Sequence, residues 1–453
     1  MKVLEIKYKI IILILLLVST IYLIKTNEPR GKKERDIEPQ EKLPKKTLTM
    51  EEAGYWIEKL EEKDIVLMDG EKIEEFNTKN FSRVDSLRDL KECKDKIEKE
   101  ELIQLIKSIS SIPEEERYNK NGDIMDKDYY NTLLSNLNLD SIKSDVEVRY
   151  GVSIDRTFIR TFPTYEPSYR KKEDTEFDRF QETAVYPWEP IIIYNKSKDG
   201  QWYFARMYNY VGWVPADKIA IGDKEEIFNY IDMEPFLVIL DRQMTIIDKI
   251  FDMGVRIPLK EEKENSYIIF IPYKDENNRL EIVEWEINKF KELHLGYLPY
   301  TKENIILQAF KLMGETYGWG GLNNTRDCSA FMMDIYRSFG IKLPRNTLDQ
   351  GSKSLGIEYD LNHNSTLEEK IALLEDIPPA TSLYMPGHTM LYLGKEGDYY
   401  YIIHQFADYY EEKEGALEKI VAMKTDISPV TIKTSSGKTY LESIYLAKEF
   451  IIE

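Results

Sequence analysis

The sequence has few of the side chains that build covalent or metal frameworks. Its 453 residues include only two cysteines and four histidines. Cys93 and Cys328 lie far apart and no Cys-x-x-Cys motif is present, so a disulfide framework is excluded. No histidine pair has the spacing of a metal motif such as His-Glu-x-x-His; the four are His294, His363, His388 and His404. We therefore predict no metal site and no cofactor.

Positive charge is scarce outside the N-terminus. Residues 1–50 carry 11 Lys and Arg against 6 Asp and Glu, which gives +5. Because the whole chain has a net charge of −19, residues 51–453 carry −24. A surface of that charge repels nucleic acid, and no basic stripe interleaved with aromatic residues counters it. The acidity indicates a solvated surface and excludes nucleic acid as a partner.

A single long apolar run, residues 10–24, stands near the N-terminus with lysines on both sides. As a helix it would reach about 22 Å, less than the ~30 Å hydrocarbon core of a bilayer. That length is typical of a signal peptide or a short signal anchor over residues 1–25. No clear small-x-small cleavage site follows, which favours the uncleaved anchor. Residues 26–48 are predicted to be a disordered linker. Either form exports the body to the cell envelope, membrane-anchored or periplasmic or extracellular.

The body exceeds a single hydrophobic core and divides by pattern into several domains. Residues 49–145 have helical periodicity, including a charged helix expected from Leu87 to Ile109. Residues 146–222 and 223–300 contain short aromatic strands separated by turns. Their aromatic side chains are expected to form barrel cores. Residues 301–453 mix helices and strands, so the overall fold class is α+β.

Cys328 is the most informative residue of the last region. It follows the glycine-rich stretch Tyr317-Gly-Trp-Gly-Gly321 and precedes an apolar-periodic helix predicted from Phe331 to Phe339. A free thiol has a pKa of about 8.5 and is mostly protonated at neutral pH. The orphan amides and dipole at a helix start favour the thiolate. The pattern therefore predicts a nucleophile.

Two histidines are placed to assist this thiol. His388 opens one predicted strand and His404 ends the next, with the loop Lys395-Glu-Gly397 between them. A loop centred on Glu396 would set the two imidazoles directly opposite, with Cβ atoms ~5 Å apart, and a centre shifted by one residue would leave them two positions off but still within side-chain reach. The second ring could then fix the tautomer of the first, as an acid does in other triads. Zinc binding by the two histidines and Cys328 is an alternative that a free thiolate disfavours.

Four motifs in this order resemble one known family. They are Tyr317-Gly-Trp-Gly-Gly, Asp327-Cys-Ser-Ala, Leu343-Pro-Arg-Asn-Thr347 with Gln350, and Gly387-His-x-x-x-Tyr-Leu-Gly394. Together they resemble the NlpC-type cysteine peptidases of the bacterial cell wall. The resemblance implies a papain-like α+β module at 301–453. It also implies two bacterial SH3-like barrels at 146–222 and 223–300 and a helical stabilising domain at 49–145.

The resemblance also implies an activity, the hydrolysis of peptidoglycan stem peptides next to D-γ-glutamate. Its Cys-His-His triad is then Cys328 as nucleophile, His388 as general base and His404 as orienting residue. The implied substrate-binding residues are Tyr317 near the oxyanion site, Asp327 and Ser329 at the free amine of a terminal L-Ala, and Asn346 and Thr347. Asn346 stands where the family often has an acid.

Other functions remain open on the same residues. The fold could serve an amidase or an acyltransferase, or the chain could be a non-catalytic wall-binding protein. An inert relative usually loses its nucleophile or base, and this chain keeps both. The sequence does not distinguish a diaminopimelate bond from a lysine bond, and it does not indicate an oligomeric state.

Overall fold

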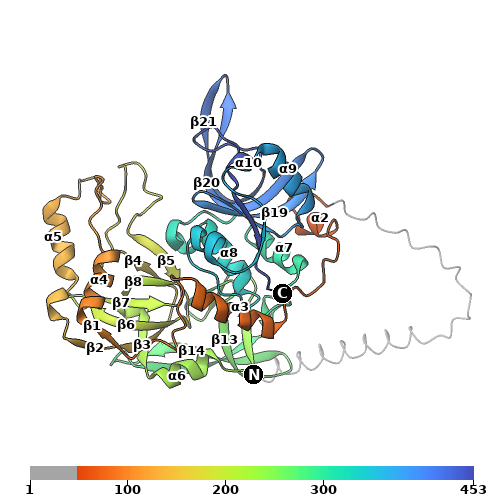
Figure 1. Cartoon of the computed structure of the whole chain (residues 1–453). Coiled ribbons are helices and arrows are strands. Elements are labelled where there is room, and N and C mark those ends of the chain that lie inside the picture. Colours follow the sequence, from red (N-terminus) through yellow and green to blue (C-terminus); the bar gives the residue numbers. More distant parts are fainter. Residues whose placement is uncertain (1–47, 453) are drawn as a thin grey trace, which may run out of the picture. The chain divides into compact units, whose positions relative to one another are not determined.

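The computed structural model describes residues 48–452 and contains helices, then strands, then both, in the predicted order (Figure 1). The apolar run at 10–24 and almost all of the predicted linker lie outside these residues. Within residues 48–452, none of the helices combines the length and the apolar character that a membrane crossing requires. The described residues form one compact unit.

The N-terminal helices divide between two cores instead of building one of their own. They are α2 (Ala53–Ile57), α3 (Gly70–Arg83), α4 (Lys99–Ile109) and α5 (Lys127–Asn136). Trp56 and Phe76, from α2 and α3, are fully buried in the core of the C-terminal region. Leu102 and Leu133, from α4 and α5, pack instead on the first β region. The region therefore joins two neighbours together.

The helix expected from Leu87 to Ile109 begins late, at Lys99. Lys96–Glu98 forms a strand, β1, which pairs with β2 (Asp145–Glu147). Cross-strand pairing takes these charged residues out of the helix despite their helical propensity. Cys93, in the preceding segment, is half-buried and free.

The first β region is a seven-stranded antiparallel sheet in the order β5-β4-β8-β7-β6-β3-β9. The strands are β3 (Arg149–Ser153), β4 (Thr157–Arg160), β5 (Gln181–Val185), β6 (Pro190–Lys196), β7 (Trp202–Met207), β8 (Tyr210–Pro215) and β9 (Ile219–Gly222). Trp202 and Trp213 are almost fully buried, so the strand aromatics fill the core as predicted. The strand order is that of an open sheet.

The second β region follows α6 (Lys224–Ile231) and is also open, in the order β15-β14-β13-β10-β16. Its strands are β10 (Phe236–Ile239), β13 (Arg256–Glu262), β14 (Ser266–Lys274), β15 (Leu280–Asn288) and β16 (Leu293–Leu295), with a separate hairpin of β11 (Gln243–Ile246) and β12 (Lys249–Asp252). Its apolar side chains share one core with α6 and the first β region. The two β regions therefore pack as a pair.

The C-terminal region is a six-stranded sheet between two helical layers (Figure 1). Its elements are α7 (Lys302–Lys311), α8 (Cys328–Arg337), β17 (Ile357–Tyr359), α9 (Leu367–Asp376), β18 (Ser382–Met385), β19 (His388–Glu396), β20 (Tyr399–Lys413), β21 (Ala416–Pro429), α10 (Tyr440–Ser443) and β22 (Leu446–Glu449). On β19, Leu391 faces the core with α7 and α8, whereas Met390 faces the core with α9 and α10. This alternation follows the two-residue period of a strand, and the α+β class is confirmed.

A buried ion network fixes the C-terminal region against both β regions. Arg326 is fully buried and donates from Nε to Asp334 at 2.6 Å and from Nη2 to Asp252 at 3.2 Å. It also pairs with Glu315. Asp252, on β12, accepts in turn from Arg156 of the first β region at 3.0 Å. Since Arg326 precedes Asp327 and Cys328, this network anchors the segment that carries the thiol.

Candidate active site

Cys328 is the first residue of α8, so the helix starts three residues earlier than predicted. Asp327 caps it, with extended backbone and a side chain that accepts from the Ala330 N–H at 3.0 Å. Such a cap satisfies one of the amides that a helix start leaves unpaired. The thiol is 8% exposed. The predicted position at a helix start is therefore confirmed.

His388 and His404 are in direct contact, in the shifted register and not directly opposite each other. Gly397 and Asp398 form the turn, because Glu396 pairs with Tyr399. A register shift between Tyr392 and Gly394 then sets Leu391 opposite Ile403. The two histidines are diagonal neighbours on one face, and Nε2 of His388 lies 2.8 Å from Nδ1 of His404. A diagonal pair is within reach of long side chains.

The histidine pair continues into a third polar group that the sequence analysis missed. Nε2 of His404 lies 2.8 Å from the Ser428 hydroxyl on β21. His404 is fully buried and stacks on Phe406, with ring centroids 3.9 Å apart. The result is a fixed line from Ser428 through His404 to His388. No local pattern marks Ser428, because only the β20–β21 pairing brings it there.

The Cys328 thiol and the two histidines lie next to the same residues, Thr389 and Tyr440. The backbone N–H of Thr389, the residue after His388, faces the Cys328 sulfur and lowers the pKa of the thiol. The Tyr440 ring lies 5.8 Å from that of His388 and 5.7 Å from that of His404. Cys328 in turn raises the pKa of the Tyr440 phenol, which burial already raises. The thiol and the two imidazoles therefore belong to one cluster.

Burial sets the protonation of this cluster. It raises the pKa of the Cys328 thiol to about 12, outweighing the helix-start amides on which the sequence analysis relied. Burial lowers the pKa of His388 to about 4, and burial together with His388 lowers that of His404 well below its usual value. Desolvation disfavours the charged form of each group. At neutral pH the resting site therefore holds a neutral thiol and neutral imidazoles, where the sequence analysis expected a thiolate.

Asp327 and Ser329 are tied to an arginine that was not among the predicted site residues. Arg345 pairs with the Asp327 carboxylate and donates to the Ser329 hydroxyl at 2.6 Å. Asp327 also accepts from the Gly320 N–H at 3.1 Å and from the Ser329 hydroxyl at 3.1 Å. The Arg345 guanidinium lowers the pKa of the Asp327 carboxyl against the effect of burial. Both Asp327 oxygens are thus occupied by donors of the chain itself.

The glycine-rich stretch before Cys328 is the contact between the C-terminal region and strand β5. Gly320 and Gly321 have φ of 58° and 86°, in the left-handed region that favours glycine. A Cβ at Gly321 would come within 2.8 Å of the Ala184 Cβ. Gln181 donates to the Gly320 carbonyl at 2.9 Å. The glycines are therefore needed for this close approach, which brings the first β region to the site.

The first β region contributes an acid and a phenol next to Arg345. Arg345 donates to the Thr183 hydroxyl at 2.8 Å and to the Glu182 carbonyl at 3.1 Å. The Glu182 carboxylate accepts from the Tyr210 hydroxyl. Burial raises the pKa of Glu182, while Tyr210 and Arg345 lower it. Neither Glu182 nor Tyr210 lies in a sequence motif, and tertiary packing alone places them beside the motif residues.

Aromatic rings from the same region line the approach to Tyr317, which is 8% exposed. Phe177 lies 6.1 Å from the Tyr317 ring, and the Arg179 guanidinium lies 4.4 Å from the Trp319 ring. Burial, and then Cys328, raise the pKa of the Tyr317 phenol, so it keeps its proton. Tyr317 is therefore a neutral donor beside the thiol.

Asn346 and Thr347 lie on the loop after Arg345, the first exposed and the second half-buried. In the described part of the chain, residues 48–452, no hydrogen bond joins either side chain to Cys328, His388 or Arg345. Their predicted substrate contacts stay a prediction. In the same part of the chain, no group of three or more His, Cys, Asp or Glu side chains could hold a metal ion.

Two segments of the chain match known families. Residues 314–406 match the NlpC/P60 family, and residues 163–215 match the SH3 domain of SH3b1 type. The chain therefore contains an NlpC/P60 domain preceded by an SH3b domain. The first spans the thiol and both histidines, and the second spans most of strands β5 to β8. The second β region stays an SH3-like domain by prediction.

Particular relatives agree with this assignment. A γ-D-glutamyl-L-lysine dipeptidyl-peptidase of Bacillus subtilis (strain 168) is 29% identical over 125 residues, which is 26% of this chain and 41% of that protein. The chain thus spans about two fifths of that relative's length. An NlpC/P60 endopeptidase structure from Photobacterium damselae subsp. piscicida has a TM-score of 0.72 and 20% identity, covering 88% of this chain and 96% of that one. This likeness confirms the fold across nearly all described residues.

Proposed function

We propose that the protein is a cysteine peptidase that hydrolyses peptidoglycan stem peptides at the bond between γ-D-glutamate and the following diaminopimelate or lysine. The observation that carries this proposal is the 2.8 Å contact from His388 Nε2 to His404 Nδ1, in the cluster that holds the Cys328 thiol at the start of α8. The activity in the name of the Bacillus subtilis relative supports the choice of bond.

The hydrogen-bond line supports His388 Nδ1 as the base. If His404 Nε2–H donates to Ser428, then His404 Nδ1 is the acceptor and His388 Nε2–H donates to it. His388 Nδ1 is then unprotonated and free to take the thiol proton. The tautomer of a catalytic imidazole is set in this way by the bond that its other nitrogen makes. His404 is thus the orienting residue, supported in turn by Ser428.

The reaction then runs in two steps. The Cys328 sulfur attacks the γ-carbonyl of the D-glutamate as His388 takes its proton, and the same proton passes to the amine that leaves with diaminopimelate or lysine. This forms a thioester with the L-Ala-D-Glu part. Water, deprotonated by His388, attacks the thioester carbonyl, and the sulfur leaves and regains its proton. Because the resting thiol and imidazole are both neutral, proton transfer accompanies the attack.

Tyr317 and the start of α8 can stabilise the charge that develops on the carbonyl oxygen. The Tyr317 phenol is neutral and adjacent to Cys328, so it can donate its proton in a hydrogen bond. The first amides of a helix have no partner within the helix and point outward. Donors fixed in a site that excludes water are among the largest contributions to catalysis. We assign these groups to the oxyanion.

The ammonium of a free N-terminal L-Ala pairs with a net negative charge on the side of the site that the SH3b domain forms. Asp327 and Glu182 carry two negative charges and Arg345 one positive charge, which leaves −1 for a substrate ammonium. Because the Asp327 oxygens already accept from Arg345 and backbone amides, we assign the ammonium to Glu182 and Tyr210. Asp327 and Ser329 hold Arg345 beneath it. A blocked amine would leave the half-buried Glu182 carboxylate without a cationic partner, which costs several kcal/mol.

The experiment that tests this function uses the tripeptides L-Ala-γ-D-Glu-diaminopimelate and L-Ala-γ-D-Glu-L-Lys, with products identified by mass. We expect release of the free third residue by the intact protein and none by Cys328→Ala. Products in which another amine replaces the third residue would indicate an acyltransferase instead. Binding without turnover would indicate a wall-binding protein. N-acetylation of the substrate should remove most of the activity, and an equal rate would refute the role of Glu182.

A further inference from the structure

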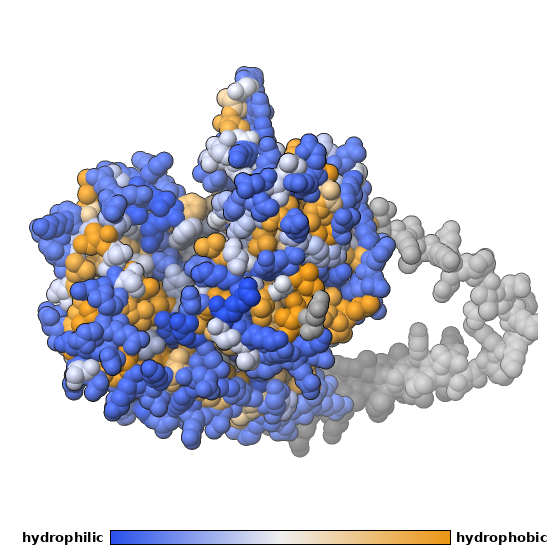
Figure 2. Space-filling view, in the orientation of Figure 1, coloured by the Kyte–Doolittle hydropathy of each residue, from blue (hydrophilic) through white to orange (hydrophobic). Residues whose placement is uncertain are grey.

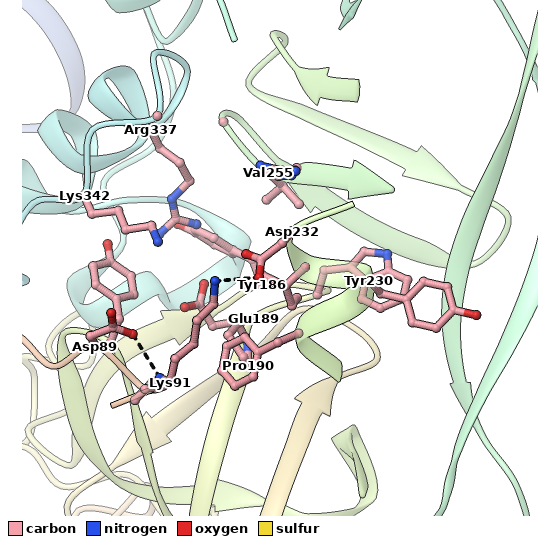
Figure 3. A pocket seen from close by; sticks show the side chains of 18 of the residues that line it. Asp89, Lys91, Tyr186, Glu189, Pro190, Tyr230, Asp232, Val255, Arg337 and Lys342 are labelled. Carbon is pink, nitrogen blue, oxygen red and sulfur yellow. Dashed lines mark hydrogen bonds and ion pairs between the residues drawn. The ribbon is translucent and has the colours of Figure 1, made fainter. Parts of the chain in front are cut away.

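A cavity of about 200 Å³ lies at the far end of α8 from the thiol (Figure 3). It is formed where α3, both β regions and the C-terminal region meet. Its wall includes Phe81, Trp188, Glu189, Tyr230, Arg337 and Lys342. Arg337 is the last residue of α8, nine positions after Cys328, or about 14 Å along the helix axis. The cavity is therefore separate from the candidate active site.

The Arg337 side chain is held in place toward this cavity. Gly254 packs so closely that a Cβ there would lie 2.6 Å from the Arg337 Cβ. The guanidinium carbon lies 4.6 Å from the Tyr186 ring centroid. Nη2 of Arg337 is buried and has no hydrogen-bond partner among the described residues. A buried donor without a partner costs free energy and calls for an explanation.

Lys342 and Glu189 add opposite charges to the same wall, and the Lys342 ammonium lies 5.6 Å from the Phe81 ring centroid. Figure 3 shows the Arg337 and Lys342 side chains converging, with Glu189 close by. Arg337 and Lys342 both lower the pKa of the Glu189 carboxyl, which burial raises. Within residues 48–452, however, no hydrogen bond or ion pair joins the Glu189 carboxylate to either cation. Lys91, on the same wall, is by contrast paired with Asp232 at 2.5 Å.

An aromatic surface completes the wall. The Trp188 ring stacks on the Tyr230 ring at 5.6 Å and 29°, and its N–H donates to the Phe270 carbonyl at 3.1 Å. Trp188 has φ of 66°, which is uncommon for a bulky residue. Strained residues of this kind concentrate at ligand sites, where the surroundings hold them. The wall therefore offers a fixed apolar face beside the charges.

We propose that this cavity binds a small zwitterion, a free amino acid or a dipeptide. Its carboxylate would lie on Arg337 and Lys342, its ammonium on Glu189, and its side chain against Trp188 and Tyr230. A cavity of about 150 Å³ holds a benzene molecule, so this one suits a ligand of roughly ten heavy atoms. The proposal does not depend on the proposed peptidase activity. A bound ligand would tie the two β regions to the C-terminal region and stabilise the chain.

The test is calorimetric titration of the full chain with alanyl-alanine, in both the L,L and the D,D form, supported by thermal unfolding. We expect saturable binding of one form and a higher unfolding temperature. Acetylating the amine or amidating the carboxylate should weaken binding at least tenfold. Lys342→Met, at an exposed position, should weaken it several-fold, and Arg337→Met at least tenfold. Glu182→Gln, in the proposed substrate site, should not change it.

Three results would overturn the proposal. One is the absence of saturable binding by either form up to about 10 mM, an affinity too weak to matter. Another is binding that is indifferent to capping of the dipeptide ends. The third is binding that Glu182→Gln abolishes and Lys342→Met leaves unchanged, which would place the dipeptide in the candidate active site.

Discussion

The two ends of helix α8 use charge in opposite ways. At the first end, Asp327 accepts from Arg345, the Gly320 and Ala330 amides and the Ser329 hydroxyl, so its charge is fully paired. At the last end, Arg337 keeps a buried N–H without a partner in the described structure. The space-filling view shows a surface that is largely hydrophilic and broken by apolar patches (Figure 2). Net charge alone therefore says little about either site.

This difference teaches how each end would work. At the first end the Asp327 charge is paired, and burial keeps the Cys328 thiol and the His388 imidazole neutral, so the reaction starts from two neutral groups. The last end keeps separated charges that only a ligand of both signs would pair. At the first site one net negative charge is left for the substrate to pair. At the second site the charges of both signs are left for a ligand to pair. The predictions below test this contrast.

The largest effect is expected from His388→Ala. Without the base, no group takes the thiol proton, whose pKa is about 12. General-base removal typically costs 10²–10⁴-fold, and we expect kcat/KM on the tripeptide to fall by about that factor. Lys342→Met, near the opposite end of the helix, is the matched control and should keep full activity. A comparable loss in both variants would show that the two ends are not independent.

Arg326→Met should lower the free energy of unfolding, because it removes the cation of the buried network that anchors the segment before Cys328. It leaves Glu315, Asp334 and Asp252 buried without their cation, and breaking a buried pair costs about 3–5 kcal/mol. Urea unfolding followed by circular dichroism measures this loss. Lys395→Met, which removes an exposed pair with Glu375, is the control and should leave the midpoint unchanged. An unchanged midpoint for Arg326→Met would mean that the network is not structural.

Stability should fall as pH drops from about 6.5 to 4. In this window the unfolded chain binds a proton at His388, whose ordinary pKa is 6.5, while the folded chain, with a His388 pKa of about 4, does not. The linked loss is about 3 kcal/mol for a shift of this size. Urea midpoints at pH 7 and pH 4.5 measure it, and His388→Gln should reduce the difference. Equal pH dependence in both proteins would contradict the buried neutral imidazole.

Ser428→Ala should have the smallest effect. It removes the acceptor that orients His404, and a hydrogen bond is worth about 0.5–1.5 kcal/mol, or roughly 2–10-fold in kcat. The acidic limb of the pH–rate profile should move as well, which a purely structural role would not cause. Ser428→Thr keeps a hydroxyl and should restore most of the rate. If neither the rate nor the pH–rate profile changes, Ser428 has no role in orienting His404.

The sequence predicted the local features of the site well and its long-range partners poorly. The thiol at a helix start and a hairpin that joins two histidines follow from spacing alone. The directly opposite register was wrong because a shift within β19 cannot be read from alternation. The prediction of a thiolate was wrong because burial, which depends on the packed fold, raises the thiol pKa by more than the amides at the helix start lower it.

The missed residues share one physical cause. Glu182, Tyr210 and Ser428 reach the site only through packing between regions and strands distant in sequence. The N-terminal helices show the same limit. Their periodicity predicted helices, but it did not show that α2 and α3 would join the C-terminal core while α4 and α5 joined the first β region.

One measurement tests the central claim most directly, that the Cys328 cluster cleaves a stem peptide. The intact protein and Cys328→Ala are incubated with L-Ala-γ-D-Glu-diaminopimelate and L-Ala-γ-D-Glu-L-Lys, and free diaminopimelate or lysine is followed over time. We predict steady release of one of them by the intact protein and none by Cys328→Ala. No release by the intact protein, or equal release by both, would contradict the claim.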